Sequence, residues 1–117
     1  MGLEDFERQD RDWAERAQKA QALAAQAYER LLSLAEKSDS GQVRRVANFI
    51  AATFDGQTFP LDLFELRTVD VSISDDMLMC IDALRWGKAD LHKLVPDGHA
   101  RVLRMCEAWA IRWPEST

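Results

Sequence analysis

The first third of the chain follows a seven-residue hydrophobic repeat. Between Glu4 and Lys37 there is no glycine or proline, and Ala, Gln, Glu, Arg and Leu predominate, all of which are good helix formers. The apolar positions step by four and three residues, as in a coiled-coil seam: Trp13, Ala17, Ala20, Ala24, Ala27, Leu31 and Leu34. This pattern predicts one helix of about 32 residues, roughly 48 Å long, which is longer than a compact domain of this size is wide. We therefore expect part of this helix to protrude, bend or find a partner.

A polar turn over residues 38–41 separates this segment from a second predicted helix. Asp39 or Ser40 is the expected cap, because its side chain can accept a hydrogen bond from the first free amides. One face of the helix recurs at helical spacing and is expected to be buried: Val43, Val46, Ala47, Ile50 and Phe54. The sequence LDLFEL then predicts a short helix or turn.

Two further helices are predicted in the second half of the chain. The first spans VSISDDMLMCIDALRW, with Asp70 as its cap and the following residues inward: Ile73, Met77, Cys80 or Ile81, and Leu84. The second spans HARVLRMCEAWAIRW up to Pro114, with these residues inward: Val102, Leu103, Cys106, Trp109 or Ala110, and Trp113. The stretch VDVSI is the one alternative candidate for a strand. We predict an all-α bundle of about four helices, divided into a long amphipathic helix over residues 1–37 and a helical domain over residues 38–117.

Composition indicates one soluble globular domain. The chain has 117 residues, of which 47% are hydrophobic and 30% charged, with a formal net charge of −5. Its apolar runs are far shorter than the roughly 20 residues that cross a bilayer. The first ten residues, MGLEDFERQD, are acidic and contain no signal-peptide core. We therefore expect a cytoplasmic protein that does not insert into a membrane.

The residues able to carry out chemistry do not form a recognisable motif. His92 and His99 flank a loop without a neighbouring nucleophile, and there is no Walker loop, Rossmann glycine cluster or HExxH motif. Cys80 and Cys106 lack the paired short spacings of a zinc site and lie among apolar neighbours, as free buried thiols do. We predict a non-enzymatic protein with no catalytic residue, metal or cofactor.

Charge is distributed unevenly along the second half of the chain. Seven acidic residues and one arginine occupy residues 55–82, a local charge of −6, whereas residues 83–113 carry a local charge of +3. This asymmetry favours a protein–protein interaction in which an acidic face meets a basic surface of another protein. The predicted face consists of Asp62, Glu65, Asp70, Asp75 and Asp76.

Two alternatives to this acidic face remain open. In the first, Arg44, Arg45, Arg101 and Arg104 contact nucleic acid, as in an accessory regulator, although an acidic protein makes nucleic acid unlikely as the main partner. The same arginines could instead form structural ion pairs, with Arg44 or Arg45 pairing with an acid of residues 55–82. In the second alternative, the heptad seam from Trp13 to Leu34 forms a homodimer, which would make the protein a structural dimerisation module.

Several short stretches resemble a known family. They are SGQVRRVANFI at residues 40–50, LDLFEL, Val69-Asp70 and ISDDML at residues 73–78. Together they are similar to a small uncharacterised family encoded on bacterial integrative and other mobile elements, over roughly residues 29–113. The resemblance implies a genomic context and no particular activity. Small acidic helical proteins of such elements often bind another protein, and inhibitors of host defence systems such as anti-CRISPR proteins are one class of them.

Overall fold

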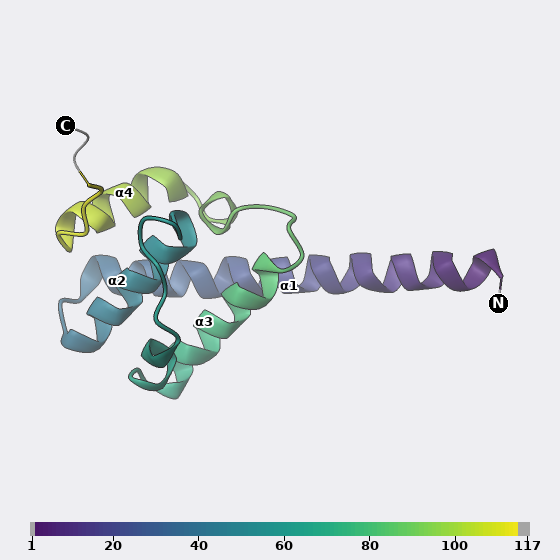
Figure 1. Cartoon of the computed structure of the whole chain (residues 1–117), viewed down its shortest axis with the longest axis horizontal. Coiled ribbons are helices and arrows are strands. Elements are labelled where there is room, and N and C mark those ends of the chain that lie inside the picture. Colours follow the sequence, from purple (N-terminus) through teal and green to yellow (C-terminus); the bar gives the residue numbers. More distant parts are fainter. Residues whose placement is uncertain (1, 115–117) are drawn as a thin grey trace.

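The computed structural model describes residues 2–114. Over these residues the chain forms four α-helices and two short 3-10 helices: α1 (Leu3–Lys37), α2 (Gly41–Phe54), η1 (Leu63–Arg67), α3 (Val71–Leu84), η2 (Leu91–Leu94) and α4 (Gly98–Ala108) (Figure 1). No strand occurs in this part of the chain, and VDVSI instead leads into α3. The predicted all-α bundle with a long N-terminal helix is confirmed.

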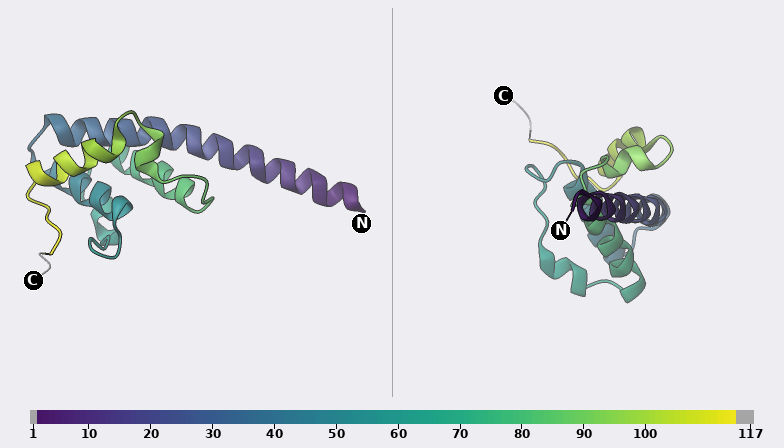
Figure 2. Two further views of the ribbon diagram at one scale, coloured as in Figure 1. Left: turned by 90° about the horizontal axis from the view of Figure 1, so that it is seen from above. Right: turned by 90° about the vertical axis from the view of Figure 1, so that its right-hand side faces the viewer.

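The C-terminal part of α1 is the axis of the bundle. α2, α3, η2 and α4 all pack against α1, with α3 and α4 on different sides of it (Figure 2). The heptad seam is buried in this core from Ala17 to Leu31, because its small alanines allow the other helices to approach closely. The largest fully buried side chains are Tyr28, Leu31, Leu32, Phe49, Ile50, Met77, Leu91 and Met105. The predicted division at residue 37 falls at the turn between α1 and α2, and core residues come from both sides of it.

The N-terminal part of α1 projects from this body as a single helix, which we call the arm (residues 3–16). Every residue of the arm is exposed, and Figure 1 shows no other element beside it. The molecule measures 55 × 37 × 27 Å, with a Cα radius of gyration of 16.2 Å. A compact chain of this length would have a radius of gyration of about 13 Å. The expectation that part of the first helix protrudes is therefore met by the arm.

α4 ends at Ala108, which is earlier than the end predicted near Trp113. The Ile111 N–H donates to the carbonyl oxygen of Cys106 (2.8 Å), and Ala110 has a φ of 57°, in the left-handed region. This arrangement is a Schellman motif, a common end to a helix. Glycine usually occupies the left-handed position, so the alanine gave no stop signal in the sequence.

Two tryptophans fasten the C-terminal end to the body. The Trp109 indole N–H donates to the carbonyl oxygen of Ala35 (2.9 Å), and the Trp113 indole N–H donates to Asp55 Oδ2 (2.8 Å). The pKa of Asp55 is lowered, mainly by the hydrogen bond from Trp113. The extended segment after α4 therefore folds back onto the end of α2 and the turn that follows it.

Some predicted caps and inward positions differ from the structure. Ser40 and Asp70 occupy the N-cap positions of α2 and α3, but neither side chain makes the expected capping hydrogen bond. The Asp70 carboxylate instead accepts a hydrogen bond from the Gln42 side chain. Leu84 and Leu103 were expected inward and are exposed. The buried positions of α3 are Met77, Cys80 and Ala83, since the small Ala83 is the side chain that fits the closely packed body.

Candidate interaction surfaces

The predicted acidic residues come together at one corner of the molecule. Asp62 and Glu65 belong to η1 or its N-cap, and Asp70, Asp75 and Asp76 to the N-cap and first turns of α3. η1 packs beside the N-terminal end of α3 (Figure 1). Residues separated in the sequence therefore share one corner.

Two of these acids are engaged in ion pairs within the chain. Asp76 accepts two hydrogen bonds from the Arg30 guanidinium, at 2.8 and 3.1 Å, and its side chain is only 14% exposed. Glu65 lies 3.7 Å from Arg45 Nη1 and accepts a hydrogen bond from the Asn48 side chain. These pairs neutralise the two carboxylates and connect α3 to α1 and η1 to α2. Glu65 and Asp76 are therefore structural residues more than partner-binding residues.

The other three acids form no ion pair with any residue in the range 2–114. Asp62 caps η1, because its Oδ1 accepts a hydrogen bond from the Phe64 N–H (3.0 Å). Asp70 exchanges two hydrogen bonds with the Gln42 side chain and so joins the beginnings of α2 and α3. Asp75 is exposed. Each carboxylate keeps its negative charge uncompensated at the surface.

Large apolar side chains lie among these acids. Phe64 is 67% exposed and Val71 75% exposed, and Leu63 is exposed to a similar degree. None of the η1 residues is buried, so this short helix contributes little to the core. The sequence pattern alone assigns these residues no role. The signal was present in LDLFEL, since a single 3-10 turn cannot turn every apolar residue inward.

We call this surface the η1–α3 corner. It consists of three exposed apolar side chains and three exposed acids: Leu63, Phe64 and Val71 with Asp62, Asp70 and Asp75. The Arg67 guanidinium lies over the Phe64 ring, 5.4 Å from its centroid, at one side of the corner.

The four arginines proposed for nucleic acid are each engaged by the chain itself. The Arg101 side chain is 13% exposed and lies between Glu29 (2.7 Å) and Glu36 (2.9 Å), and hydrogen bonding with Glu36 raises its pKa. The other three have these partners: Glu65 for Arg45, Asp97 for Arg104 and the Trp109 carbonyl oxygen for Arg44. Three of the four form ion pairs, which favours the structural alternative over phosphate binding.

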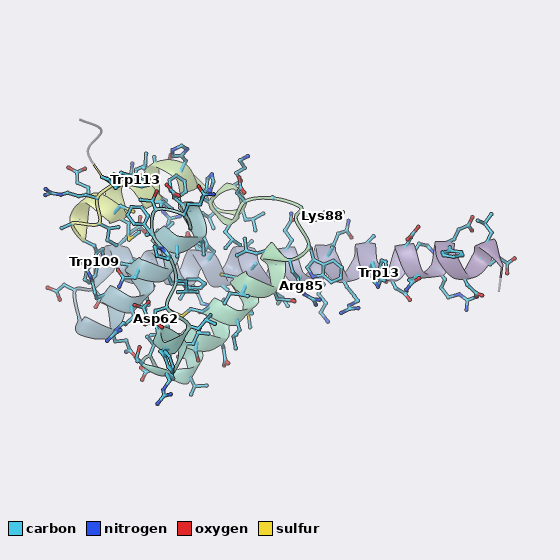
Figure 3. All side chains as sticks on the ribbon, viewed as in Figure 1. Trp13, Asp62, Arg85, Lys88, Trp109 and Trp113 are labelled. Atoms are coloured by element: carbon cyan, nitrogen blue, oxygen red, sulfur yellow. The ribbon has the colours of Figure 1, made fainter. Side chains whose placement is uncertain are left out.

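A second charged surface lies where the arm leaves the body, and we call it the elbow. The Arg16 and Arg85 guanidinium groups both lie against the Trp86 ring, 5.3 and 4.7 Å from its centroid. Together with Lys19 they line a surface hollow that also includes Asp82, the ion-pair partner of Arg85. Figure 3 shows Arg85 and Lys88 beside α1 at this point, with Trp13 further out on the arm.

Comparison with known proteins places most of this chain in one family. A model described as a family of unknown function, DUF7673, matches residues 25–110. The chain belongs to this family. No curated protein and no solved structure matches it. The DUF7673 region includes the η1–α3 corner and most of the body, whereas the arm precedes it. Among residues 2–114, no helix is long and apolar enough to cross a membrane.

The predicted oligomer seam is divided between the arm and the body. Ala17, Ala20, Ala24, Ala27 and Leu31 are buried within this chain, and Leu34 packs against the same core. These residues are covered by α2, α3 and η2, so they are not available to a second copy. Trp13 alone remains 47% exposed, because it lies beyond the body on the arm.

The cysteines and histidines do not form a metal site among residues 2–114. No group of three or more His, Cys, Asp or Glu side chains suited to a metal ion occurs among residues 2–114. Cys80 and Cys106 are free and buried, and burial raises the pKa of the Cys80 thiol to about 12. His92 and His99 lie edge-on to the Phe54 ring. The histidines therefore take part in an aromatic cluster.

Proposed function

We propose that this protein is a non-enzymatic interaction protein that uses the η1–α3 corner to bind a basic surface of another protein. The observation that carries the proposal is the coincidence of exposed apolar side chains with three acids that the chain leaves uncompensated. An apolar centre rimmed by charge is typical of protein-binding surfaces. The apolar side chains supply affinity, and the acids steer a basic partner into place.

We limit the proposed acidic face to three of the five acids that the sequence suggested. Asp62, Asp70 and Asp75 are the acids proposed to face the partner, whereas Glu65 and Asp76 hold η1 and α3 in position through Arg45 and Arg30. Leu63, Phe64 and Val71 join the proposed site. Because the corner lies within the matched family region, other members of the family are candidates for the same kind of binding.

The proposed partner is a host protein or a protein encoded on the same mobile element. The resemblance of the SGQVRRVANFI stretch to proteins of bacterial mobile elements supports this context. A basic surface that normally holds nucleic acid would suit an acidic corner of this kind. Inhibition of a host defence system, as by anti-CRISPR proteins, is the function that we propose to test first.

The test compares recovery of partners from a bacterial lysate by four versions of the full chain. Phe64→Ala removes the exposed ring and Asp75→Lys reverses a rim charge, while Glu107→Lys makes the same charge change on α4, outside the corner. We expect the wild type and Glu107→Lys to recover the same partner. The two corner variants should each weaken binding of the purified partner roughly tenfold, since central aromatic side chains and rim charges are worth about 1–2 kcal/mol.

Two results would contradict this proposal. Equal binding by all four proteins would remove the corner from the function. An unchanged salt dependence for Asp75→Lys would show that its charge does not steer the partner. A mobility-shift titration at low salt provides a further check, because arginines that are already bound within the chain should give no complex with nucleic acid.

A further inference from the structure

The arm exposes a stripe of apolar side chains that continues the buried seam of the body. Leu3, Phe6 and Trp13 lie on the same heptad positions as Ala17 and Ala20, and all three are exposed, Phe6 to 65%. A lone helix of this length is marginal in water, and its tertiary contacts end at the elbow. The stripe is therefore an unpartnered continuation of an apolar face that is covered elsewhere.

The arm and the elbow carry opposite charges. The tip, residues 3–7, has the sequence LEDFE, which contains three acids and no base. The elbow carries Arg16, Lys19, Arg85 and Lys88, and of these four only Arg85 forms an ion pair with another residue in the range 2–114, namely Asp82. One copy of the protein therefore contains both an acidic, apolar segment and a basic, aromatic surface, at the two ends of the same arm.

We propose that two copies associate through antiparallel arms, with the tip of each arm on the elbow of the other. A two-fold arrangement of this kind brings tip and elbow together twice, because both arms have the same length. Each arm rises about 21 Å from elbow to tip at 1.5 Å per residue, so the two arms lie side by side along that length. The apolar side chains of each tip lie against Leu23 and Trp86 of the other copy's elbow hollow, while the charged ends meet opposite charges.

The charge sequence of the arm supports an antiparallel register. When Arg11 of one copy is level with Asp12 of the second copy, every level that carries two charges pairs opposite signs. Glu4 is level with Lys19 and Glu7 with Arg16, whereas Arg8 and Glu15, which are also level, lie on the face opposite the stripe and do not contribute. Leu3 is then level with Ala20, which the body already covers, so Leu3 lies against the exposed Leu23 of the elbow hollow. A parallel pair would instead set tip against tip and elbow against elbow, with like charges facing.

A second copy fits this surface better than nucleic acid or an anionic membrane does. Acids outnumber bases two to one along the arm, so phosphate groups would be repelled from it. The acidic tip, in contrast, is complementary to the elbow of its own kind. This inference concerns a surface separate from the η1–α3 corner, so it goes beyond the proposed function and can fail without it.

The test uses three charge-reversed versions of the full chain. The tip variant carries Glu4→Lys and Glu7→Lys, the elbow variant carries Arg16→Glu and Lys19→Glu, and the combined variant carries all four changes. Sedimentation equilibrium over a range of protein concentrations measures the dimer dissociation constant. We expect the wild type, of 13.4 kDa, to approach twice that mass as the concentration rises. Each single-end variant should dissociate roughly tenfold more readily, because like charges then face each other.

The combined variant is the decisive one. It has the net charge of the wild type, and its basic tip again faces an acidic elbow, so dimerisation should return. Lysines near a helix N-terminus oppose the helix dipole and fray the tip. If fraying were the cause of the loss in the tip variant, the combined variant would remain monomeric, which would overturn the proposal. Asp75→Lys, at the corner, is the control and should dimerise like the wild type.

Other results would also overturn it. The proposal would be wrong if the wild type stayed monomeric at every concentration, or if the single-end variants dimerised as the wild type does. It would also be wrong if the elbow bound duplex DNA and the protein did not self-associate. Loss of dimerisation in the single-end variants with unchanged capture of the partner would locate self-association on the arm. Loss of the partner in Phe64→Ala with unchanged dimerisation would assign partner binding to the corner.

Discussion

Gly98, the first residue of α4, allows this helix to begin directly against η2. A Cβ atom at this position would collide with the backbone carbonyl group of His92 and would stand 2.9 Å from Val95 Cγ2. Backbone atoms cannot turn aside as a long side chain can. The requirement for glycine therefore comes from the closeness of η2, because the φ of Gly98 is not in the left-handed region.

We predict that Gly98→Ala lowers the free energy of unfolding by about 2–3 kcal/mol, the usual cost of forcing atoms into a packed site. Gly41→Ala is the matched control, because a Cβ atom there meets nothing within 4 Å. Urea denaturation of the three proteins, followed by circular dichroism, measures the difference. If both alanine variants unfolded at the wild-type midpoint, the close contact between α4 and η2 would not exist in solution.

Single residues also show why the acidic face was only partly predictable. A count of charges along residues 55–82 gives a strongly acidic segment, but it ignores bases that come from elsewhere in the chain. Arg30 is 46 positions from Asp76, and no local pattern announces their pairing. Glu65 is likewise neutralised by Arg45, from the preceding helix. Asp62, Asp70 and Asp75 could be separated from these two only once the fold was known.

At the scale of elements, the sequence predicted α1 best and the end of α4 worst. A heptad repeat uninterrupted by glycine or proline defines a helix over many turns, so the bounds of α1 follow closely from it. The end of α4 depends on one residue, Ala110, which adopts a left-handed conformation where the segment after α4 packs back onto the body. The arm was likewise foreseen from helix length alone, whereas the elbow was not, because Arg16 and Trp86 meet only through the packing of α3 on α1.

The short element η2 should make stability depend on pH through His92. Burial lowers the pKa of His92; nearby Asp90 raises it, while His99 and Lys93 lower it further. In the unfolded chain the pKa of this histidine returns to its ordinary value, so the unfolded state binds more protons between the two values. The free energy of unfolding should therefore fall as the pH drops from neutral through the ordinary range of histidine.

The replacement His92→Phe removes this titration while keeping an aromatic ring against Phe54. Thermal unfolding of the wild type and of this variant between neutral and mildly acidic pH gives the comparison. We expect the melting temperature of the wild type to decline more steeply with acidification. Parallel curves would mean that His92 is as accessible to protons in the folded protein as in the unfolded chain.

At the scale of the whole molecule, the two interaction surfaces follow from one imbalance. α1 contains about 52 Å of helix, and the rest of the chain is too short to cover all of it. The body therefore gathers around the C-terminal part of α1 and leaves the arm outside. η1 and the beginning of α3 lie at the far edge of this body, where Phe64 and Val71 have no further element to pack against. Apolar residues are therefore exposed on the arm and at the η1–α3 corner because the other helices pack around the C-terminal part of α1 and cover neither place.

This arrangement predicts two levels of protection along a single helix. Hydrogen exchange at residues 24–35, which lie in the core, requires opening of the whole bundle, whereas the arm can fray without disturbing any buried contact. In dilute wild-type protein we expect amides of residues 6–13 to exchange orders of magnitude faster than those of residues 24–35. Raising the protein concentration should slow exchange in the arm of the wild type, where antiparallel arms cover each other, and leave it fast in the elbow variant. Equal protection along the full length of α1 in dilute solution would show that the arm is stable without a second copy. That result would contradict the proposal that the arm needs a partner.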